Sequence, residues 1–291
     1  MNIINGVIPV AGLGTRLLPS TKSQPKEMLP VGRKPVVQYV VEEFQQAGVN
    51  QILFVTGRSK TSIENHFDTD SELLRSLRDG NKQDLLATLE FERLEMNFFY
   101  TRQREQNGLG DAILYAETFA GTQPFVVGLG DSIIAQGNDA PIIAKLGECF
   151  ETRDTDCVIG FEEVPIEDTR HYGVAKPATD DDVFEVLDLV EKPKVEEAPS
   201  NLAIAGRYIF SPMIFKALRK TSKDAKGELQ LTDAIRLLIK WGHKVHGVKF
   251  TNGAKRYDIG NFESYFKTFV DFALADEELG QMLRDHLKQL L

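Results

Sequence analysis

The sequence predicts an α/β fold in which helices flank a central mixed, mostly parallel sheet, with a small antiparallel extension. Two observations lead to this prediction. In the first half of the chain, short runs rich in β-branched and aromatic residues alternate with helical patterns. Such alternation is typical of a parallel sheet covered on both faces. After about residue 170, strand-like runs follow one another without a helix between them, which indicates antiparallel pairing.

The first half supplies buried strands and the helices that cover them. We expect strands at residues 5–10, 51–57, 97–101, 124–130 and 156–164. Helical patterns cover residues 34–49, 62–67, 109–120 and 139–152, with apolar positions spaced for one helix face. In the first of these helices, Pro35 suits the first helical position and Gly48 suits the C-terminal cap.

The rest of the chain adds a helical insertion, the extension and a tail. Residues 68–96 predict two charged amphipathic helices separated at Gly80. The extension consists of strands at 172–177, 182–193 and 201–210, then helices at 212–220 and 230–242 and a strand at 244–250. We therefore expect one domain over residues 1–260 and a helical tail over 261–291.

The tail carries an apolar stripe that has two interpretations. Its members are Leu279, Met282, Leu283, Leu287 and Leu290. They fall on one helix face, which either packs back onto the core or contacts another copy of the chain.

Composition and charge exclude several classes of protein. A length of 291 residues with 42% apolar and 26% charged residues suits a globular chain that buries a sizeable core. The net charge of −9 argues against a nucleic-acid partner. No apolar run approaches the roughly 18 residues that a membrane helix needs, and no basic segment at the N-terminus marks a signal peptide. Cys149 and Cys157 do not form a CxxC pair and fit the reducing cytoplasm.

A glycine loop with an excess of cations follows the first strand. Residues 11–30 read AGLGTRLLPSTKSQPKEMLP and place Arg16 and Lys26 around Gly12 and Gly14. Backbone N–H groups can approach an anion where no Cβ intervenes, and nearby cations hold its charge. The pattern therefore indicates a phosphate cradle, although a strand-to-helix turn with a solvated basic rim gives the same pattern.

The loop does not match the dinucleotide-binding or P-loop patterns. A GxGxxG motif would need glycine where Leu17 stands, and no GxxxxGK[ST] run is present. A nicotinamide-dependent dehydrogenase is therefore excluded.

Two aspartates at strand ends are candidate metal ligands. Asp131 follows the strand at 124–130, and Asp258 stands between two cations and a glycine in KRYDIG. Magnesium is held by one or two carboxylates together with substrate phosphates and water. The ordinary alternatives are a capping or turn role for Asp131 and a salt bridge from Asp258 to Lys255 or Arg256.

Polar residues at the end of the long strand, together with a glycine in the next strand, suggest a second ligand subsite. Glu191 and Lys192 precede Pro193, which stops the strand. A carboxylate can accept hydrogen bonds from sugar hydroxyls, and an ammonium can hold a phosphate. Gly206 in AGRY allows close approach of a ligand, or simply marks a β-bulge. His243 and His246 would alternate to opposite strand faces, which argues against a metal pair.

Taken together, these motifs resemble the bacterial UTP–glucose-1-phosphate uridylyltransferases, a branch of the sugar nucleotidyltransferases. The resemblance runs from about residue 3 to residue 275. GLGTR is shared by sugar nucleotidyltransferases broadly, whereas PKEMLP, EAPSNLA and QLTDA are more specific to the uridylyl branch. The resemblance implies a Rossmann-like nucleotidyltransferase fold over residues 1–260 and Mg²⁺-dependent transfer of UMP from UTP to glucose 1-phosphate, giving UDP-glucose and pyrophosphate. It also implies a cytoplasmic enzyme that forms a homodimer or homotetramer.

The resemblance also assigns roles to individual residues. Residues expected to line the nucleotide are Ala11, Gly12, Gly14, Thr15, Gln103 and Gly108, the last two facing the uracil. Arg16, Lys26 and Lys192 are expected to act in catalysis. Glu191, Lys192 and Gly206 would hold the sugar and its phosphate, and Asp131 and Asp258 would bind the metal.

Four positions depart from the usual pattern of these relatives. Ser132 stands where many carry a second acid, Asp111 where His is frequent, Asn107 in place of Leu and Lys226 in place of Gly. These departures leave open the base and sugar preference. The alternatives are a thymidylyltransferase on the same fold and a non-catalytic paralogue that binds nucleotide sugars and regulates a partner enzyme.

Overall fold

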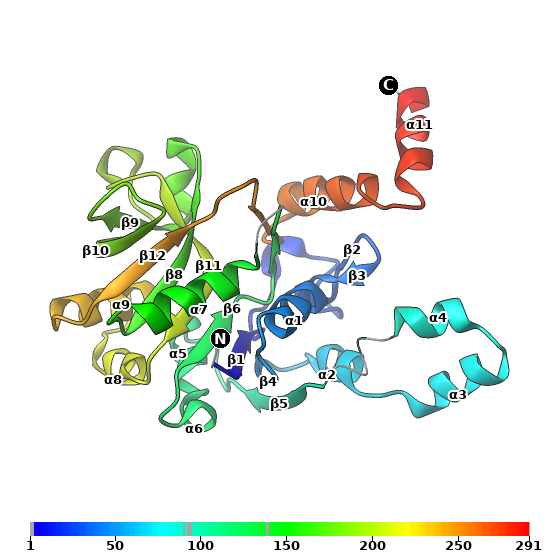
Figure 1. The fold of residues 1–291 in the computed structure, drawn as a ribbon, viewed down its shortest axis with the longest axis horizontal. Coiled ribbons are helices and arrows are strands. Elements are labelled where there is room, and N and C mark those ends of the chain that lie inside the picture. Colours follow the sequence, from blue (N-terminus) through cyan, green and yellow to red (C-terminus); the bar gives the residue numbers. More distant parts are fainter. Residues whose placement is uncertain (1–2, 90, 92–94, 138–139, 291) are drawn as a thin grey trace.

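The computed structural model describes residues 3–89, 91, 95–137 and 140–290, and within them a nine-stranded sheet runs through the molecule (Figure 1). Across the sheet the strands are β5 (Asn97–Arg102), β4 (Gln51–Thr56), β1 (Asn5–Pro9), β6 (Phe125–Gly128), β11 (Leu202–Phe210), β8 (Cys157–Glu163), β12 (Val245–Lys249), β10 (Val183–Glu191) and β9 (Gly173–Pro177). Every strand that the sequence predicts is present in this sheet, which confirms the predicted fold class.

Strand direction divides the sheet into two parts. β5, β4, β1 and β6 pair in parallel. In the other part, β11 runs antiparallel to both β6 and β8, β8 and β12 pair in parallel, and β10 runs antiparallel to β12 and β9. β9 also pairs with β11 at Ala203 and Val174, so the antiparallel part curls back on itself. The parallel part therefore has one edge where all carboxyl ends meet.

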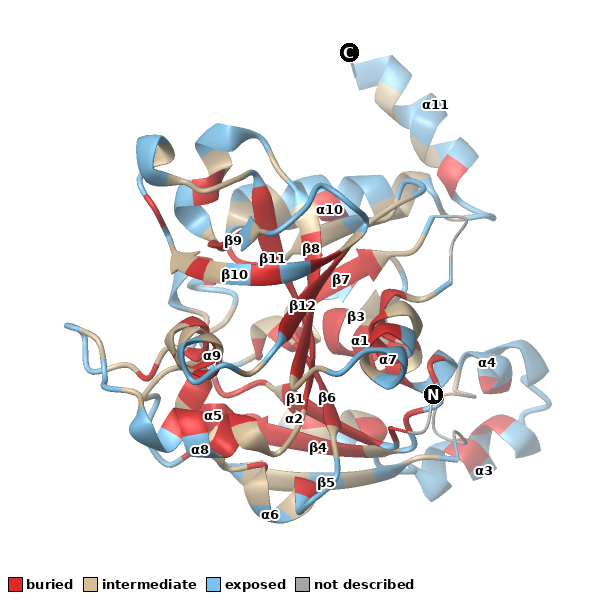
Figure 2. Ribbon diagram, turned by 60° about the vertical axis from the view of Figure 1, so that its left-hand side comes forward, coloured by how far each residue is buried: buried red, intermediate tan, exposed pale blue. Residues whose placement is uncertain are grey.

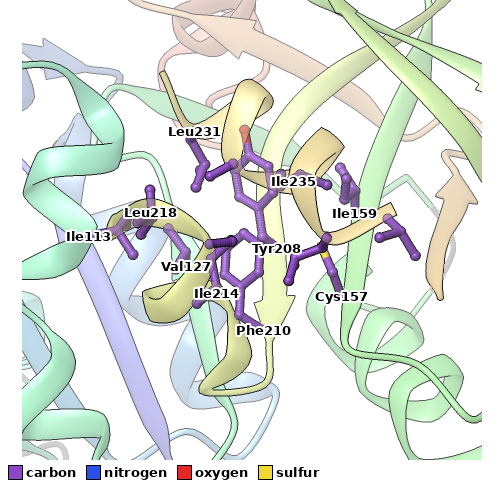
Figure 3. Close-up of a cluster of buried hydrophobic side chains, with 14 of the residues drawn as sticks. Ile113, Val127, Cys157, Ile159, Tyr208, Phe210, Ile214, Leu218, Leu231 and Ile235 are labelled. Carbon is purple, nitrogen blue, oxygen red and sulfur yellow. The ribbon is translucent and has the colours of Figure 1, made fainter. Parts of the chain in front are cut away.

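Helices cover both faces of the sheet because successive strand residues point to opposite sides. Val7 belongs to the apolar cluster on one face and Ile8 to the cluster on the other. The first face is covered by α5 (Leu109–Leu114), α8 (Met213–Lys220) and α9 (Leu231–Lys240), and the second by α1 (Val36–Gln46), α2 (Thr61–Phe67) and α7 (Ile142–Thr152). Figure 2 shows the buried residues concentrated along the strands, and Figure 3 shows the first cluster around Tyr208 and Phe210.

Several boundaries differ from the sequence prediction. Pro35 is the N-cap of α1 and not its first residue, while Gly48 follows the cap residue with a positive φ of 87°. The helix expected at 109–120 divides into α5 and α6 (Glu117–Ala120), although Tyr115 keeps right-handed helical angles between them. The helix expected from residue 139 begins at Ile142, and residue 139 lies outside the described residues.

Two segments project from the body in Figure 1. The first contains α3 (Ser71–Asp79) and α4 (Gln83–Thr88), which bury a small cluster of their own. The second contains α10 (Phe262–Leu274) and α11 (Gly280–Leu290), and α11 stands away from the sheet. The domain division at residue 260 stays a prediction.

Short elements complete the fold and support the loops beside the sheet. They are β2 (Pro30–Val31), β3 (Lys34–Pro35), β7 (Ser132–Ala135), β13 (Lys255–Asp258) and the 3₁₀ helices η1 (Thr15–Leu17), η2 (Lys26–Met28), η4 (Ile166–His171) and η5 (Val195–Glu197). Among the described helices, none is long and apolar enough to cross a bilayer.

A fully buried arginine joins β11, α1 and β7. Arg207 of β11 is 0% exposed, and its Nη2 group lies 2.8 Å from Oε2 of Glu43 in α1. The same Nη2 group donates to the carbonyl of Ser132 in β7 at 2.8 Å. A buried charge is tolerated only when it is paired and hydrogen-bonded, so this arginine fixes β7 against the sheet.

Candidate active site

Two neighbouring cavities lie beside the carboxyl edge of the parallel strands. The first has a volume of about 460 Å³ and the second of about 560 Å³. The first is lined by Pro9, Ala11, Gly12, Leu13, Gly14, Thr15, Arg16, Lys26, Glu27, Gln103, Gln106, Gly108, Leu109, Ala112, Leu129, Asp131, Glu228 and Gly260. Arg16, Leu109 and Leu129 line both cavities, which therefore adjoin.

The glycine loop forms one wall of the first cavity. Gly14 has a positive φ of 67° and caps η1, a conformation that glycine adopts without strain. The Thr21 hydroxyl donates to the Gly14 carbonyl at 2.7 Å. A Cβ on Gly12 would lie 3.8 Å from Nζ of Lys26, so the loop backbone and the lysine face the same space.

Lys26 and Asp131 form an ion pair on the wall of this cavity. Burial acts to lower the pKa of Lys26, but the charges of Asp131 and Glu27 outweigh it and raise that pKa above its ordinary value. Burial likewise acts to raise the pKa of Asp131, and the ammonium of Lys26 reverses this and lowers it. Both groups are therefore charged at neutral pH. Asp131 also stands in the turn between β6 and β7, so the turn interpretation holds together with the ion pair.

A two-stranded sheet brings the second aspartate to the first. β13 pairs antiparallel with β7, so that Asp258 stands opposite Ser132, and the Ile259 N–H donates to the Asp131 carbonyl at 2.9 Å. Burial and the charge of Asp131 raise the pKa of Asp258. The shift has the direction expected for two carboxylates that share a site.

Arg16 lies near the same point. A Cβ on Gly260 would be 2.5 Å from Oδ2 of Asp258 and 3.2 Å from Nη2 of Arg16. The salt bridges considered as alternatives for Asp258 do not form, because Arg256 pairs with Glu162 and Lys255 pairs with Asp271. A carboxylate and a guanidinium therefore meet where the two cavities join.

The two aspartates fit a magnesium ion. In the described part of the chain, no group of three or more His, Cys, Asp or Glu residues could hold a metal. A pair of carboxylate donors is nonetheless what Mg²⁺ uses when substrate phosphates and water complete its shell. Beside them, the hydroxyl of Ser132 is buried without a hydrogen-bond partner among the described residues.

A buried ion pair lies under the first cavity. Nζ of Lys60 lies 2.8 Å from Oε2 of Glu27, with side chains only 7% and 2% exposed. Burial raises the pKa of Glu27, and Lys60 opposes that rise. Because Glu27 is the neighbour of Lys26, this pair holds the segment that carries the catalytic candidate.

Gln103 and Gly108 lie at the other side of the first cavity. Gln103 follows β5 and is 5% exposed. Gly108 has a positive φ of 97°, and a Cβ there would lie 2.8 Å from the Leu229 carbonyl. Only glycine fits this contact, which joins the start of α5 to the segment before α9.

The second cavity is built on the antiparallel part. Glu191 accepts from the Thr232 hydroxyl at 2.7 Å and lies 3.0 Å from Nζ of Lys192. Lys192 has a positive φ of 46°. Gly206, at φ 76°, sits within the irregular register between Ile204 and Tyr208. The register shift that the β-bulge interpretation predicts is therefore present around Gly206, and Gly206 also lines the second cavity.

Every candidate site residue from the sequence lines one of the two cavities. The first holds Ala11, Gly12, Gly14, Thr15, Arg16, Lys26, Gln103, Gly108 and Asp131, and the second holds Arg16, Glu191, Lys192, Gly206 and Asp258. Their roles stay predictions.

Sequence reasoning missed other lining residues. Glu228 lines the first cavity, while Gln230 and Thr232 line the second. Gln230 and Thr232 belong to the QLTDA motif, which pointed to the family branch but was given no role in the site, and Glu228 stands two residues before that motif. Arg256 stacks over the Tyr172 ring at 4.2 Å, and no local pattern links those two positions.

The fold and the paired cavities define a nucleotidyl transferase. The model of the nucleotidyl transferase family matches residues 5–274, and the chain belongs to this family.

Relatives and solved structures show which branch of the family the chain is similar to. A UTP–glucose-1-phosphate uridylyltransferase of Staphylococcus epidermidis is 45% identical over 289 residues, covering 99% of this chain and 98% of the relative. A UTP-bound UGPase from Acinetobacter baumannii matches with a TM-score of 0.90 and 34% identity, covering 99% of this chain and 100% of that one. A UDP-glucose pyrophosphorylase complexed with UDP-glucose matches with a TM-score of 0.84 and 37% identity, covering 93% and 98%. These matches confirm the resemblance predicted from the sequence and show that the chain is a nucleotidyltransferase enzyme.

Proposed function

We propose that this enzyme transfers UMP from UTP to glucose 1-phosphate, giving UDP-glucose and pyrophosphate. The observation that carries the proposal is the junction of the two cavities, where Arg16, Asp131 and Asp258 meet. A nucleotide in the first cavity and a sugar phosphate in the second would bring their phosphates together at this point. The names of the relatives support the same pair of substrates.

The reaction needs no general base in this site. The phosphate oxygen of glucose 1-phosphate is ionised at neutral pH, and it attacks the α-phosphorus of UTP while the bond to pyrophosphate breaks opposite to it. Phosphoryl transfer asks a protein mainly for positioning and charge stabilisation. Lys26 and Arg16 would stabilise the negative charge of the leaving pyrophosphate, and Lys192 would orient the attacking phosphate.

Asp131 and Asp258 would hold a magnesium ion. When bound, Mg²⁺ neutralises charge on the phosphate oxygens and orients them. Lys26 keeps the pKa of Asp131 below its ordinary value, and so keeps this carboxylate ionised, the form in which it would bind a metal ion.

The remaining residues would bind the base and the sugar. Gln103 and Gly108 would face the uracil across the first cavity. Glu191 and Gly206 would contact the glucose, because a carboxylate accepts hydrogen bonds from hydroxyls and a glycine admits the ring closely.

The C-terminal arm, α10 and α11, would connect copies of the chain in a homodimer or homotetramer. The exposed large apolar side chains here are Phe266, Phe269 and Val270 of α10, Leu279 in the turn between the two helices, and Met282 and Leu290 of α11. Leu279 therefore lies just outside the helix on whose stripe the sequence placed it. An exposed apolar face of this kind marks an association site, and α11 does not pack onto the sheet (Figures 1 and 2). The proposed location is the cytoplasm, where the free buried thiols of Cys149 and Cys157 would stay reduced.

The test is pyrophosphate release with glucose 1-phosphate and Mg²⁺, measured in parallel with UTP, dTTP, ATP, CTP and GTP. The expected result is the highest kcat/KM with UTP. A preference for dTTP would instead identify a thymidylyltransferase. No release with any nucleotide, from protein that still binds UDP-glucose, would favour a regulatory paralogue.

A further inference from the structure

Two hydrogen bonds fix the direction of the Gln103 side-chain amide. Its Nε2 group donates to the Gly108 carbonyl at 3.2 Å and to Oδ2 of Asp111 at 2.7 Å. A carbonyl and an ionised carboxylate only accept hydrogen bonds, so the end of the amide between them must be the NH₂ group. Oε1 of Gln103 is then the free end, and it accepts no hydrogen bond from the described residues.

The frame around this amide is rigid. The Leu229 N–H donates to the Asn107 carbonyl at 2.7 Å, and the Gly110 N–H donates to the Leu229 carbonyl at 2.9 Å. These bonds hold both ends of the turn at Gly108, which is the N-cap of α5. Asp111, in the first turn of α5, therefore stands at a fixed place behind Gln103.

Asp111 is not among the residues that line the first cavity, whereas Gln103 is. Asp111 contacts the lining of this cavity through its hydrogen bond to Gln103. The charge-assisted bond from Nε2 to Asp111 is shorter than the bond to Gly108, and bonds to charged groups are the stronger kind.

We propose that Asp111 is a positioning residue that sets the base selectivity of the enzyme. By binding the NH₂ end of Gln103, it leaves the amide oxygen to face the base as an acceptor. Uracil carries a donor at N3–H, while cytosine carries an acceptor at N3 and a donor at its exocyclic amine. Placed against N3, the fixed amide oxygen accepts from uracil but meets another acceptor in cytosine, so it favours uracil. This inference rests on the proposed function, since it assumes that Gln103 faces a pyrimidine.

Removing the acceptor at position 111 would release the amide. In Asp111→Leu, Gln103 can rotate and present its NH₂ group to N3 of cytosine, with only the Gly108 carbonyl opposing the rotation. The ratio of kcat/KM for UTP to that for CTP is expected to fall about tenfold, as the loss of one charge-assisted bond allows. Asp111→Asn keeps an acceptor oxygen and is expected to lie between Asp111→Leu and the unmodified enzyme.

The double variant with Gln103→Ala separates a positioning role from a structural one. If Asp111 acts through Gln103, Asp111→Leu changes the UTP-to-CTP ratio in the native background and leaves it unchanged in the Gln103→Ala background. An unchanged ratio in Asp111→Leu overturns the inference. So does an equal change in both backgrounds, because Asp111 would then act by another route.

Binding measurements keep this test separate from the proposed function. Calorimetric titration of each variant with UDP and with CDP reports base selectivity without turnover. An enzyme that binds UDP but releases no pyrophosphate contradicts the proposed function, and the shift of the UDP-to-CDP ratio in Asp111→Leu still tests the positioning role. Should Asp111→Leu not fold by circular dichroism, the intermediate ratio expected for Asp111→Asn provides the same test.

Discussion

The two cavities hold their charged groups in different ways. In the first, the side chains of Lys26 and Asp131 are 15% and 19% exposed and pair with each other. In the second, the Lys192 side chain is 59% exposed and pairs with its chain neighbour, Glu191. The first cavity thus has its charges placed before any ligand binds, while the second keeps a cation in solvent.

This difference matches the two tasks that phosphoryl transfer sets. Charges that act on a transition state are most effective when they are oriented in advance and shielded from water. A charge that gathers a diffusing anion can remain hydrated. We therefore expect substitution of Lys26 or Asp131 to lower kcat and substitution of Lys192 to raise KM.

The largest expected effect is that of Asp131→Asn. The variant keeps the shape of the side chain but removes the charge that would bind the metal, so kcat should fall about 10³-fold or more. Pyrophosphate release is measured across a Mg²⁺ series, with circular dichroism to confirm the fold. Asp84→Asn on the exposed helix α4 serves as the control. Normal turnover by Asp131→Asn would place the metal elsewhere.

Lys26→Ala is expected to lower kcat about 10²–10³-fold, the usual cost of removing one oriented group that stabilises transition-state charge. The KM for glucose 1-phosphate should change little, because Lys26 lines the first cavity and not the second. Steady-state kinetics decide this, with Lys22→Ala as the control on the exposed part of the same loop. Unchanged turnover would remove Lys26 from the mechanism.

The buried pair under the first cavity is expected to matter for stability. Lys60→Met leaves Glu27 buried without its partner and should lower the free energy of unfolding by about 3–5 kcal/mol. Replacing both residues, as Lys60→Met with Glu27→Leu, should restore most of this loss. Urea denaturation of the two variants gives the comparison, and equal destabilisation of both would show that the pair itself stabilises the fold.

The smallest expected effect is in the second cavity. Lys192→Ala should raise the KM for glucose 1-phosphate about tenfold, since the variant loses roughly one charged hydrogen bond to the phosphate, and the exposure of the lysine keeps that loss small. The KM for UTP should stay within about twofold. Lys194→Ala is the matched control, because that lysine is 77% exposed and pairs with the nearby Glu197. An effect confined to UTP would contradict the assignment of the second cavity to the sugar phosphate.

Local patterns in the sequence predicted the strands and the glycine loop because their signals are local. The sequence predicted a buried strand before Asp131, and the structure confirms it as β6. The pairings that make the site are long-range. Lys26 and Asp131 are 105 residues apart, and only the pairing of β7 with β13 brings Asp258 to them. Hydrophobic periodicity in a single sequence does not indicate which two strands pair with each other.

The bond between Gln103 and Asp111 illustrates the same limit at short range. Both residues were noted in the sequence, eight positions apart, one for the base and one as a departure from the family pattern. Their contact depends on the turn at Gly108, whose angle is set by the Leu229 backbone more than a hundred residues later.

The buried Arg207 affects how the protein unfolds. Its guanidinium holds Glu43 and the Ser132 carbonyl, partners 164 and 75 residues distant along the chain. If α1 detaches, the charge of Arg207 is left inside the sheet without its carboxylate, which costs several kcal/mol, and if β7 detaches the guanidinium loses a hydrogen bond. Partial opening near the active site is therefore disfavoured, and the parallel and antiparallel parts are expected to unfold together in one cooperative transition.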